Sequence, residues 1–224
     1  MFTGFSQATQ DFLWGLLFHN ERPWFEAHRA QYQQHLALPF RALALDTAAG
    51  MRQLFPQLDL TLHIARIYRD ARRLHGRGPY KEHLWFSLSG ANWDSTVSFW
   101  FEIGAADFAY GLGMYGTGAE PMARYRRSIA ANPSAFARIV QPIVQAGIFE
   151  PCGEEYKRPK GDLGPVLNPW YNRKYIDVEH SEPFGPALFS PDLPQVLANG
   201  FQTLMPLYLY INTACGLQVP QATL

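Results

Sequence analysis

Hydrophobic residues recur at helical spacing through the first quarter of the chain. Ser6 is a suitable N-cap for a first helix, and Pro23 marks the start of a second. A third follows Pro39 and ends before Pro56. The first of these helices carries its apolar stripe on Ala8, Phe12, Leu13, Leu16 and Leu17. The pattern therefore predicts helices over residues 5–55.

The hydrophobic period changes to two between residues 58 and 115. Apolar and polar positions alternate there in four runs, and short turns rich in Gly, Asn or Asp separate them. The runs are Leu60–Ile64, Leu84–Leu88, Val97–Ile103 and Phe108–Met114. Such spacing predicts an antiparallel meander of about four to six strands with one packed face.

Helical spacing returns over residues 118–147 and again over a C-terminal helix at 191–214. Between them, residues 148–190 are rich in Pro and Gly and are predicted to be irregular. Helices, a block of strands and further helices indicate an α+β fold. We therefore expect a single α+β domain over residues 1–224, its sheet packed with the N-terminal and C-terminal helices.

Composition excludes several classes of protein. Hydrophobic residues make up 47% of the 224 positions and aromatic residues 15%, so disorder is excluded as the main state. The formal net charge is zero, which argues against a general nucleic-acid coat or a binder of acidic membranes. The sequence shows no secretory signal and no apolar run of ~20 residues, so we expect a cytoplasmic protein with no membrane partner.

The two cysteines lie far apart in the sequence. Cys152 and Cys215 show no CxxC spacing, so neither a disulfide framework nor a zinc knuckle is implied. We expect both to be reduced, buried thiols.

The densest group of charged residues lies between residues 64 and 83. Six cations face only Asp70 and Glu82 there; they are Arg66, Arg69, Arg72, Arg73, Arg77 and Lys81. Crowded like charges repel, so each needs solvent, a carboxylate or a bound anion. Arginine forks suit phosphate, carboxylate or sulfate, which favours an oxyanion site. The alternative is a solvated loop whose turn is held by one Arg–Asp pair.

A second cationic string lies in the segment predicted to be irregular. It contains Lys157, Arg158 and Lys160 beside Tyr156. If it converges with the first group, the two form a pocket of the phosphate-binding type. If they lie on opposite faces, both are solvated surface, and the sequence leaves these alternatives open.

The histidines do not predict a metal site. His28 and His35 lie seven residues apart, and the spacing of an HExxH zinc motif is absent. His63 and His83 fall on predicted strands, where we interpret them as core histidines bonded to backbone carbonyls.

Two tryptophans fall on the polar face of their predicted strands. Trp85 and Trp100 therefore either lie under a second layer or line a ligand groove. Aromatic strands beside arginines can also stack nucleobases. No GxGxxG, Walker A or GxSxG string occurs, and no particular cofactor is indicated.

Three strings carry a family resemblance. HNERPWF (19–25) is similar to an Asn-Asn-x-x-x-Trp-Phe element, RIYRDARR…GPYKEH (66–83) to Arg-x-x-Arg-Asp-x-Arg-Phe and Pro-Tyr-Lys-x-His elements, and YKRPKG (156–161) to Lys-Arg-x-Pro-Lys-Gly. In these strings the chain resembles the family called domain of unknown function 2461, uncharacterised proteins of bacteria and some eukaryotes. The resemblance implies no established activity.

Position by position, the resemblance points to the central cationic segment. The matching residues are Arg66, Arg69, Asp70, Arg72, Pro79, Tyr80, Lys81 and His83. The family usually has Phe where Arg73 stands and a charged pair where Gly76 and Arg77 stand. The missing acidic residue removes a candidate metal ligand or base and leaves this loop more cationic.

The leading hypothesis is a protein that binds a small anion, phosphate or carboxylate, in a cleft of cationic and tyrosine side chains. The candidate residues are Arg66, Arg69, Asp70, Arg72, Tyr80, Lys81, Lys157 and Arg158. If the protein is an enzyme, we expect phosphoryl or acyl chemistry on an anionic substrate, with Asp70 orienting an arginine or acting as base. The alternative is a nucleic-acid or protein interaction module that uses the same basic edge with Trp85 and Trp100.

Overall fold

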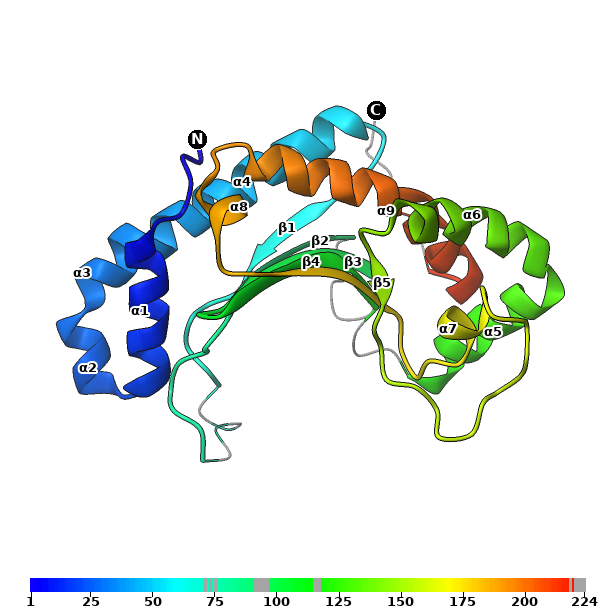
Figure 1. The fold of residues 1–224 in the computed structure, drawn as a ribbon, viewed down its shortest axis with the longest axis horizontal. Coiled ribbons are helices and arrows are strands. Elements are labelled where there is room, and N and C mark those ends of the chain that lie inside the picture. Colours follow the sequence, from blue (N-terminus) through cyan, green and yellow to red (C-terminus); the bar gives the residue numbers. More distant parts are fainter. Residues whose placement is uncertain are drawn as a thin grey trace.

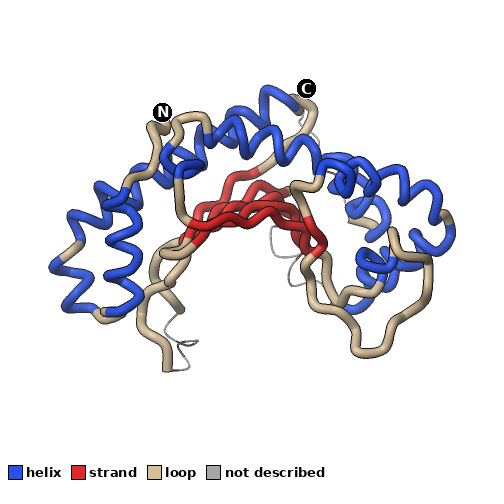
Figure 2. The backbone as a smooth tube through the Cα atoms, in the orientation of Figure 1, coloured by secondary structure: helices blue, strands red, loops and turns tan. Residues whose placement is uncertain are grey.

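A six-stranded sheet lies under an arch of helices (Figures 1 and 2). The computed structural model describes residues 1–70, 72, 74, 76–90, 97–114, 118–217 and 219. Helices α4 (Leu38–Leu54) and α9 (Leu193–Cys215) run over the convex face of the sheet, with the short α8 (Pro186–Phe189) beside α9 (Figure 1). The helices before α4 form an arm at one end that continues into α4, and the helices between residues 119 and 171 form an arm at the other end. Within the described ranges, none of the helices has both the length and the apolar character needed to cross a bilayer.

The N-terminal arm is almost continuously helical. Its elements are α1 (Gln7–Phe18), α2 (Arg22–Ala27), α3 (Arg29–Gln31), the π-helical turn η1 (Tyr32–Ala37) and α4 (Leu38–Leu54). Ser6 precedes α1 as predicted, but the second and third predicted helices are joined through η1. Pro39 lacks an N–H, and in the turn before it the His35 carbonyl accepts a hydrogen bond from the Thr9 hydroxyl at 2.6 Å. This bond to α1 helps the helix to continue into Pro39, where the sequence predicted a new start.

The sheet confirms the predicted α+β class. Its strands are β1 (Thr61–Ile64), β2 (Leu84–Ser89), β3 (Val97–Ile103), β4 (Asp107–Met114), β5 (Glu150–Pro151) and β6 (Asp177–Pro183). All neighbours are antiparallel, in the order β1-β2-β3-β4-β6-β5. The helices after β4 are α5 (Ala119–Ala131), α6 (Pro133–Ala146), α7 (Asn168–Tyr171), α8 (Pro186–Phe189) and α9 (Leu193–Cys215).

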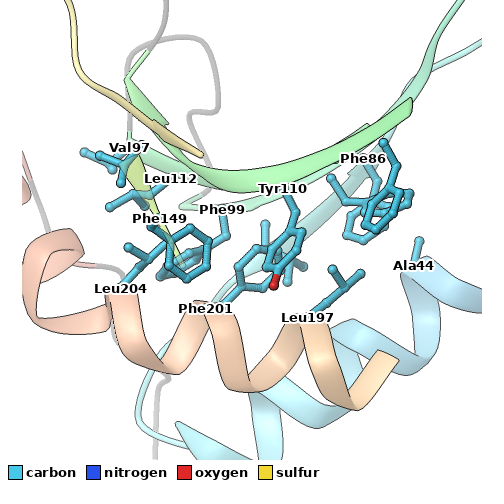
Figure 3. Packing of buried hydrophobic residues seen from close by; sticks show 14 of the residues in the cluster. Ala44, Phe86, Val97, Phe99, Tyr110, Leu112, Phe149, Leu197, Phe201 and Leu204 are labelled. Carbon is cyan, nitrogen blue, oxygen red and sulfur yellow. The ribbon is translucent and has the colours of Figure 1, made fainter. Parts of the chain in front are cut away.

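The apolar side of the strands packs against α4 and α9 (Figure 3). Phe99 on β3 contacts two aromatic rings of α9, with ring centroids 5.2 Å from Phe201 and 4.9 Å from Tyr208. On the α4 side, the Phe40 ring lies 5.7 Å from that of Phe86. Full burial of each such side chain contributes about 1.5–3 kcal/mol to stability. These helices therefore fix the orientation of the whole sheet.

The other side of the strands is polar, and we call it the open face. Because side chains alternate along a strand, the residues between the core positions project onto it. One row across the sheet, given by the strand register, is His63, Ser87, Trp100, Gly111 and Glu179. Trp85 and Trp100 thus lie on the face opposite the core, as the sequence predicted.

Strand β6 was missed by the sequence pattern, which predicted residues 148–190 to be irregular. Among the β6 residues on the core side of the sheet, only Val178 is aliphatic. Its neighbour on that face, His180, packs edge-on against Tyr110 with ring centroids 5.2 Å apart and hydrogen-bonds to the Ile148 carbonyl at 2.9 Å. A strand held by polar and aromatic contacts gives no period-two hydrophobic signal.

The close approach of β4 and β6 requires glycine at position 111. A Cβ built there would lie 1.9 Å from the Val178 carbonyl oxygen. We predict that Gly111→Ala lowers the free energy of unfolding by about 2–3 kcal/mol, measured by urea denaturation, because the two strands must separate. Gly118→Ala, where no atom lies within 4 Å of the added Cβ, should change it by no more than about 1 kcal/mol. Equal effects of the two substitutions would contradict this account.

Candidate functional site

After β1 the chain continues into the Arg66–Lys81 loop. The two ends of this loop form a short antiparallel pair at its base. The Arg69 N–H donates to the Pro79 carbonyl at 2.8 Å, and the Lys81 N–H donates to the Ile67 carbonyl at 2.7 Å. Tyr68 and Tyr80 form the bridge between these two bonds. The base of the loop is therefore as regular as a strand pair, so consecutive side chains point to opposite sides.

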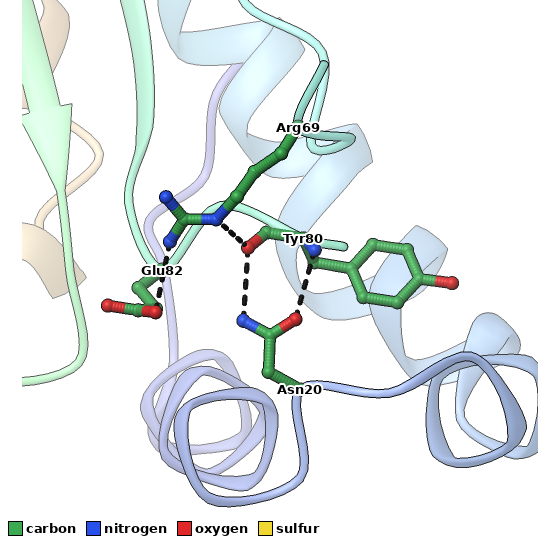
Figure 4. A network of polar contacts seen from close by, with 4 residues as sticks. All are labelled: Asn20, Arg69, Tyr80 and Glu82. Carbon is green, nitrogen blue, oxygen red and sulfur yellow. Dashed lines mark hydrogen bonds and ion pairs between the residues drawn. The ribbon is translucent and has the colours of Figure 1, made fainter. Parts of the chain in front are cut away.

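Two side chains tie this base to the N-terminal arm and to the segment that leads into β2 (Figure 4). The Asn20 amide brackets the backbone of Tyr80: its Nδ2 donates to the Tyr80 carbonyl at 3.0 Å, and its Oδ1 accepts the Tyr80 N–H at 2.9 Å. Arg69 donates to the same carbonyl from Nε at 2.6 Å and to Glu82 from Nη2 at 2.9 Å. A Cβ at Gly78 would lie 2.3 Å from Asn20 Cγ, so this approach needs glycine.

The Tyr80 side chain completes the attachment. It is 1% exposed and stacks on Phe25 with ring centroids 4.1 Å apart. Burial, reinforced by the neighbouring Tyr68, raises the pKa of the Tyr80 hydroxyl. Two of the candidate site residues, Arg69 and Tyr80, thus hold the loop in place.

Asp70 and Arg72 pair with each other at the tip of the loop. Arg72 Nη2 lies 2.8 Å from Asp70 Oδ2, and the Arg72 side chain is 87% exposed. This pair matches the alternative prediction of a solvated loop whose turn is held by one Arg–Asp pair. Arg73 lies outside the described residues.

The second cationic string lies far from the first. Lys157 and Arg158 are exposed in the loop before α7, at the end of the arch opposite the Arg66–Lys81 loop (Figure 1). Nearby, Lys160 Nζ lies 4.4 Å from the centroid of the Tyr156 ring, as cations prefer. The two strings therefore do not converge on one cleft.

Four of the candidate cations have no carboxylate partner among the described residues: Arg66 and Lys81 in the first string, and Lys157 and Arg158 in the second. Arg66 and Lys81 are the ones that lie close to each other and to an aromatic face of the sheet. In the part of the chain that the structure describes, no carboxylate oxygen lies within 4 Å of either. Lys81 Nζ lies 5.6 Å from the centroid of the Trp85 ring. Burial lowers the pKa of Lys81, and the charges of Arg66 and Arg69 lower it further.

His83 lies on the same side of the chain as Lys81 and Trp85. Its side chain is 52% exposed, and its Nδ1 lies 3.5 Å from a carboxylate oxygen of Glu102. Gly104 makes room for the ring, because a Cβ there would lie 2.9 Å from His83 Nδ1. The interpretation of His83 as a core histidine is therefore wrong.

Glu102 lies opposite Trp85 in the register of β2 and β3. Burial raises the pKa of its carboxyl group, Asp107 and Glu179 raise it further, and His83 opposes the rise. We call Arg66, Lys81, His83, Trp85 and Glu102 the Trp85 patch. Glu102 was not predicted from the sequence, and His83 was identified as part of the family-like motif but not as a ligand-binding residue. The alternation of Lys81, His83 and Trp85 was a usable signal for a shared face.

The Trp85 patch can perform two kinds of chemistry. Arg66 and Lys81 can hold an anion beside an indole ring. Glu102 and His83, with the raised carboxyl pKa, can exchange a proton with a group bound next to them. The His63 ring, 5.3 Å from that of Trp85, closes the patch on the β1 side.

Cys152 lies beyond the Trp85 patch, on the edge of the open face. Its thiol and one carboxylate oxygen each from Asp177 and Glu179 lie within 4.8 Å of one another, the one such group of metal-ligand types among the described residues. Burial and the two carboxylates raise the pKa of the Cys152 thiol, so a metal would have to displace its proton. The prediction of a buried thiol holds for Cys215 and is wrong for Cys152, an exposed residue whose thiol is only partly covered.

The role of Asn20 in holding the backbone of Tyr80 can be tested by substitution. We predict that Asn20→Ala lowers the free energy of unfolding by about 1–3 kcal/mol, because the Tyr80 N–H loses its partner and the Tyr80 carbonyl keeps only its bond from Arg69. Amide hydrogen exchange at Tyr80 should accelerate in the variant. Gln7→Ala, which removes only exposed side-chain bonds to Gln10 and Asp11, is the control. Unchanged protection at Tyr80 in Asn20→Ala would contradict the role assigned to Asn20.

Two comparisons with known proteins bear on identity. No curated protein matches the chain. A family model described as "Conserved hypothetical protein (DUF2461)" matches residues 8–210 of the 224. That span includes Asn20, the whole Arg66–Lys81 loop and every strand of the sheet. The chain therefore belongs to the DUF2461 family of conserved hypothetical proteins.

Proposed function

We propose that the protein binds a small anionic ligand, bearing a carboxylate or a phosphate, at the Trp85 patch. Arg66 and Lys81 meet the anionic group, and Trp85 forms the wall beside it. The observation that carries the proposal is the gathering of Arg66, Arg69 and Lys81, of which only Arg69 has a carboxylate partner among the residues that the structure describes.

Electrostatics favours an anion at this position. Like charges in a partly buried site repel more strongly than in water. The pKa of Lys81 is lowered first by burial and then by the charges of Arg66 and Arg69. An anion between Arg66 and Lys81 would offset both effects. An exposed basic loop with its charges in water would gain much less.

A nucleic acid is the weaker candidate for this face. Glu102, Asp177 and Glu179 share the open face with the two tryptophans and would repel a chain of phosphates. The cationic strings also lie at opposite ends of the molecule, so they form no continuous basic edge. A small anion avoids the carboxylates and needs only the end of the face near Lys81.

We expect Lys81→Ala and Arg66→Ala each to weaken binding of phosphate or succinate by about tenfold, measured by isothermal titration calorimetry. Lys157→Ala is the matched control, since it removes the same charge at the far end of the arch. The proposal fails if the Lys157 variant loses as much affinity as the Lys81 variant, or if neither anion binds the unmodified protein.

The pH dependence of binding provides a separate test. A bound anion favours the charged form of Lys81, so binding should take up protons at pH values near the lowered pKa of Lys81. Affinity should therefore fall as the pH rises through a value below 10.5, the usual pKa of lysine. Arginine keeps its charge over this whole pH range, so the affinity of the Lys81→Arg variant should depend much less on pH. A profile identical in the two proteins would show that Lys81 does not titrate at the site.

A further inference from the structure

The Trp85 patch places a negative group directly beside its cations. Trp85 and Glu102 are cross-strand partners, so their side chains start about 5 Å apart. Lys81 approaches the same indole ring, with Nζ 5.6 Å from its centroid. A ligand lying against Trp85 thus reaches Lys81 and Glu102 together.

Within the described ranges of the chain, neither the charge of Lys81 nor that of Glu102 is fully neutralised. The groups facing Glu102 are His83, 3.5 Å away, and the carboxylates of Asp107 and Glu179, so negative groups outnumber the one imidazole. Lys81 faces Arg66 and Arg69. An excess of positive charge therefore lies around Lys81 and an excess of negative charge around Glu102, and both lie close to Trp85.

We infer that the ligand of the Trp85 patch is a zwitterion, whose carboxylate meets Arg66 and Lys81 and whose ammonium group meets Glu102. This inference rests on the proposed function and adds the cationic half of the ligand. An anion alone would leave the excess negative charge at Glu102 unchanged, and a simple cation would leave the excess positive charge at Lys81 unchanged. A molecule with both charges relieves both, which is charge complementarity across a single indole ring.

The geometry also sets the separation of the two charges. The strand spacing and the distance from Lys81 to Trp85 place them about 5–10 Å apart. The two charges of an α-amino acid are closer than this. The separation fits an ω-amino acid of four to six carbons or a peptide of two to three residues, since each extended residue spans about 3.3–3.6 Å. The indole of Trp85 would cover the uncharged middle of either ligand.

The test compares matched ligands by isothermal titration calorimetry. The probes are 4-aminobutyrate and 6-aminohexanoate against butyrate and hexanoate, and trialanine against N-acetyl-trialanine. We expect each zwitterion to bind at least about tenfold more tightly than its partner without the ammonium group. Preference confined to the ω-amino acids would identify a free small zwitterion, and preference confined to trialanine would identify peptide termini.

Variants at Glu102 assign the preference to its carboxylate. Glu102→Gln should bring the affinity ratio of zwitterion to carboxylate close to one while carboxylate binding remains. Glu102→Asp, which keeps the charge, should retain part of the preference and guards against misfolding of the first variant. Glu120→Gln on α5, an exposed carboxylate in the other arm, is the control.

The two proposals fail in distinguishable ways. Equal binding within all three pairs of probes would overturn the zwitterion inference and leave the anion site standing. A preference that survives in Glu102→Gln would overturn the role of Glu102. If no carboxylate, phosphate or zwitterion binds, both proposals are wrong.

Discussion

The arrangement of the candidate site depends on the two hydrogen bonds between the Asn20 amide and the backbone of Tyr80. They join the N-terminal helical arm to the base of a loop 60 residues further along the chain. With its backbone bracketed and its ring stacked on Phe25, Tyr80 has one available orientation. In an extended segment the next side chain points the other way, so fixing Tyr80 directs Lys81 toward Trp85. The Pro-Tyr-Lys element thus combines an anchor with a presented cation.

The same alternation divides the sheet between stability and a candidate function. In β2, Phe86 packs under α4 while Trp85 and Ser87 lie on the open face. A slip of one residue in register would exchange these two sets, so the apolar core against α4 and α9 also fixes the polar face. The Trp85 patch is therefore held rigidly although much of it is open to solvent.

Much of the fold could be predicted from the sequence because its strands β1 to β4 alternate apolar and polar residues. Strand β6 could not, because His180 and Glu182 occupy core-side positions where an apolar residue would have given the signal. The π-helical turn before Pro39 was equally hidden, since its support is a bond from the distant Thr9.

The candidate site was only partly predictable. Local charge identified the Arg66–Lys81 segment, but not that Arg69 is occupied by the Tyr80 carbonyl and Glu82. Nor could it reveal that Lys157 and Arg158 lie at the far end of the arch, because distance between segments is a property of the tertiary fold. The position of Glu102 next to His83 follows from strand register, which one sequence does not specify.

The most direct test of an anion site at the Trp85 patch is a two-dimensional NMR titration of the ¹⁵N-labelled protein with succinate. Binding at this patch should produce saturable shifts of the Trp85 indole signal and of the backbone amides of Lys81 and His83, with the amides of Lys157 and Arg158 unmoved. Saturable shifts centred on Lys157 and Arg158, or no saturable shift at all, would contradict an anion site at this patch.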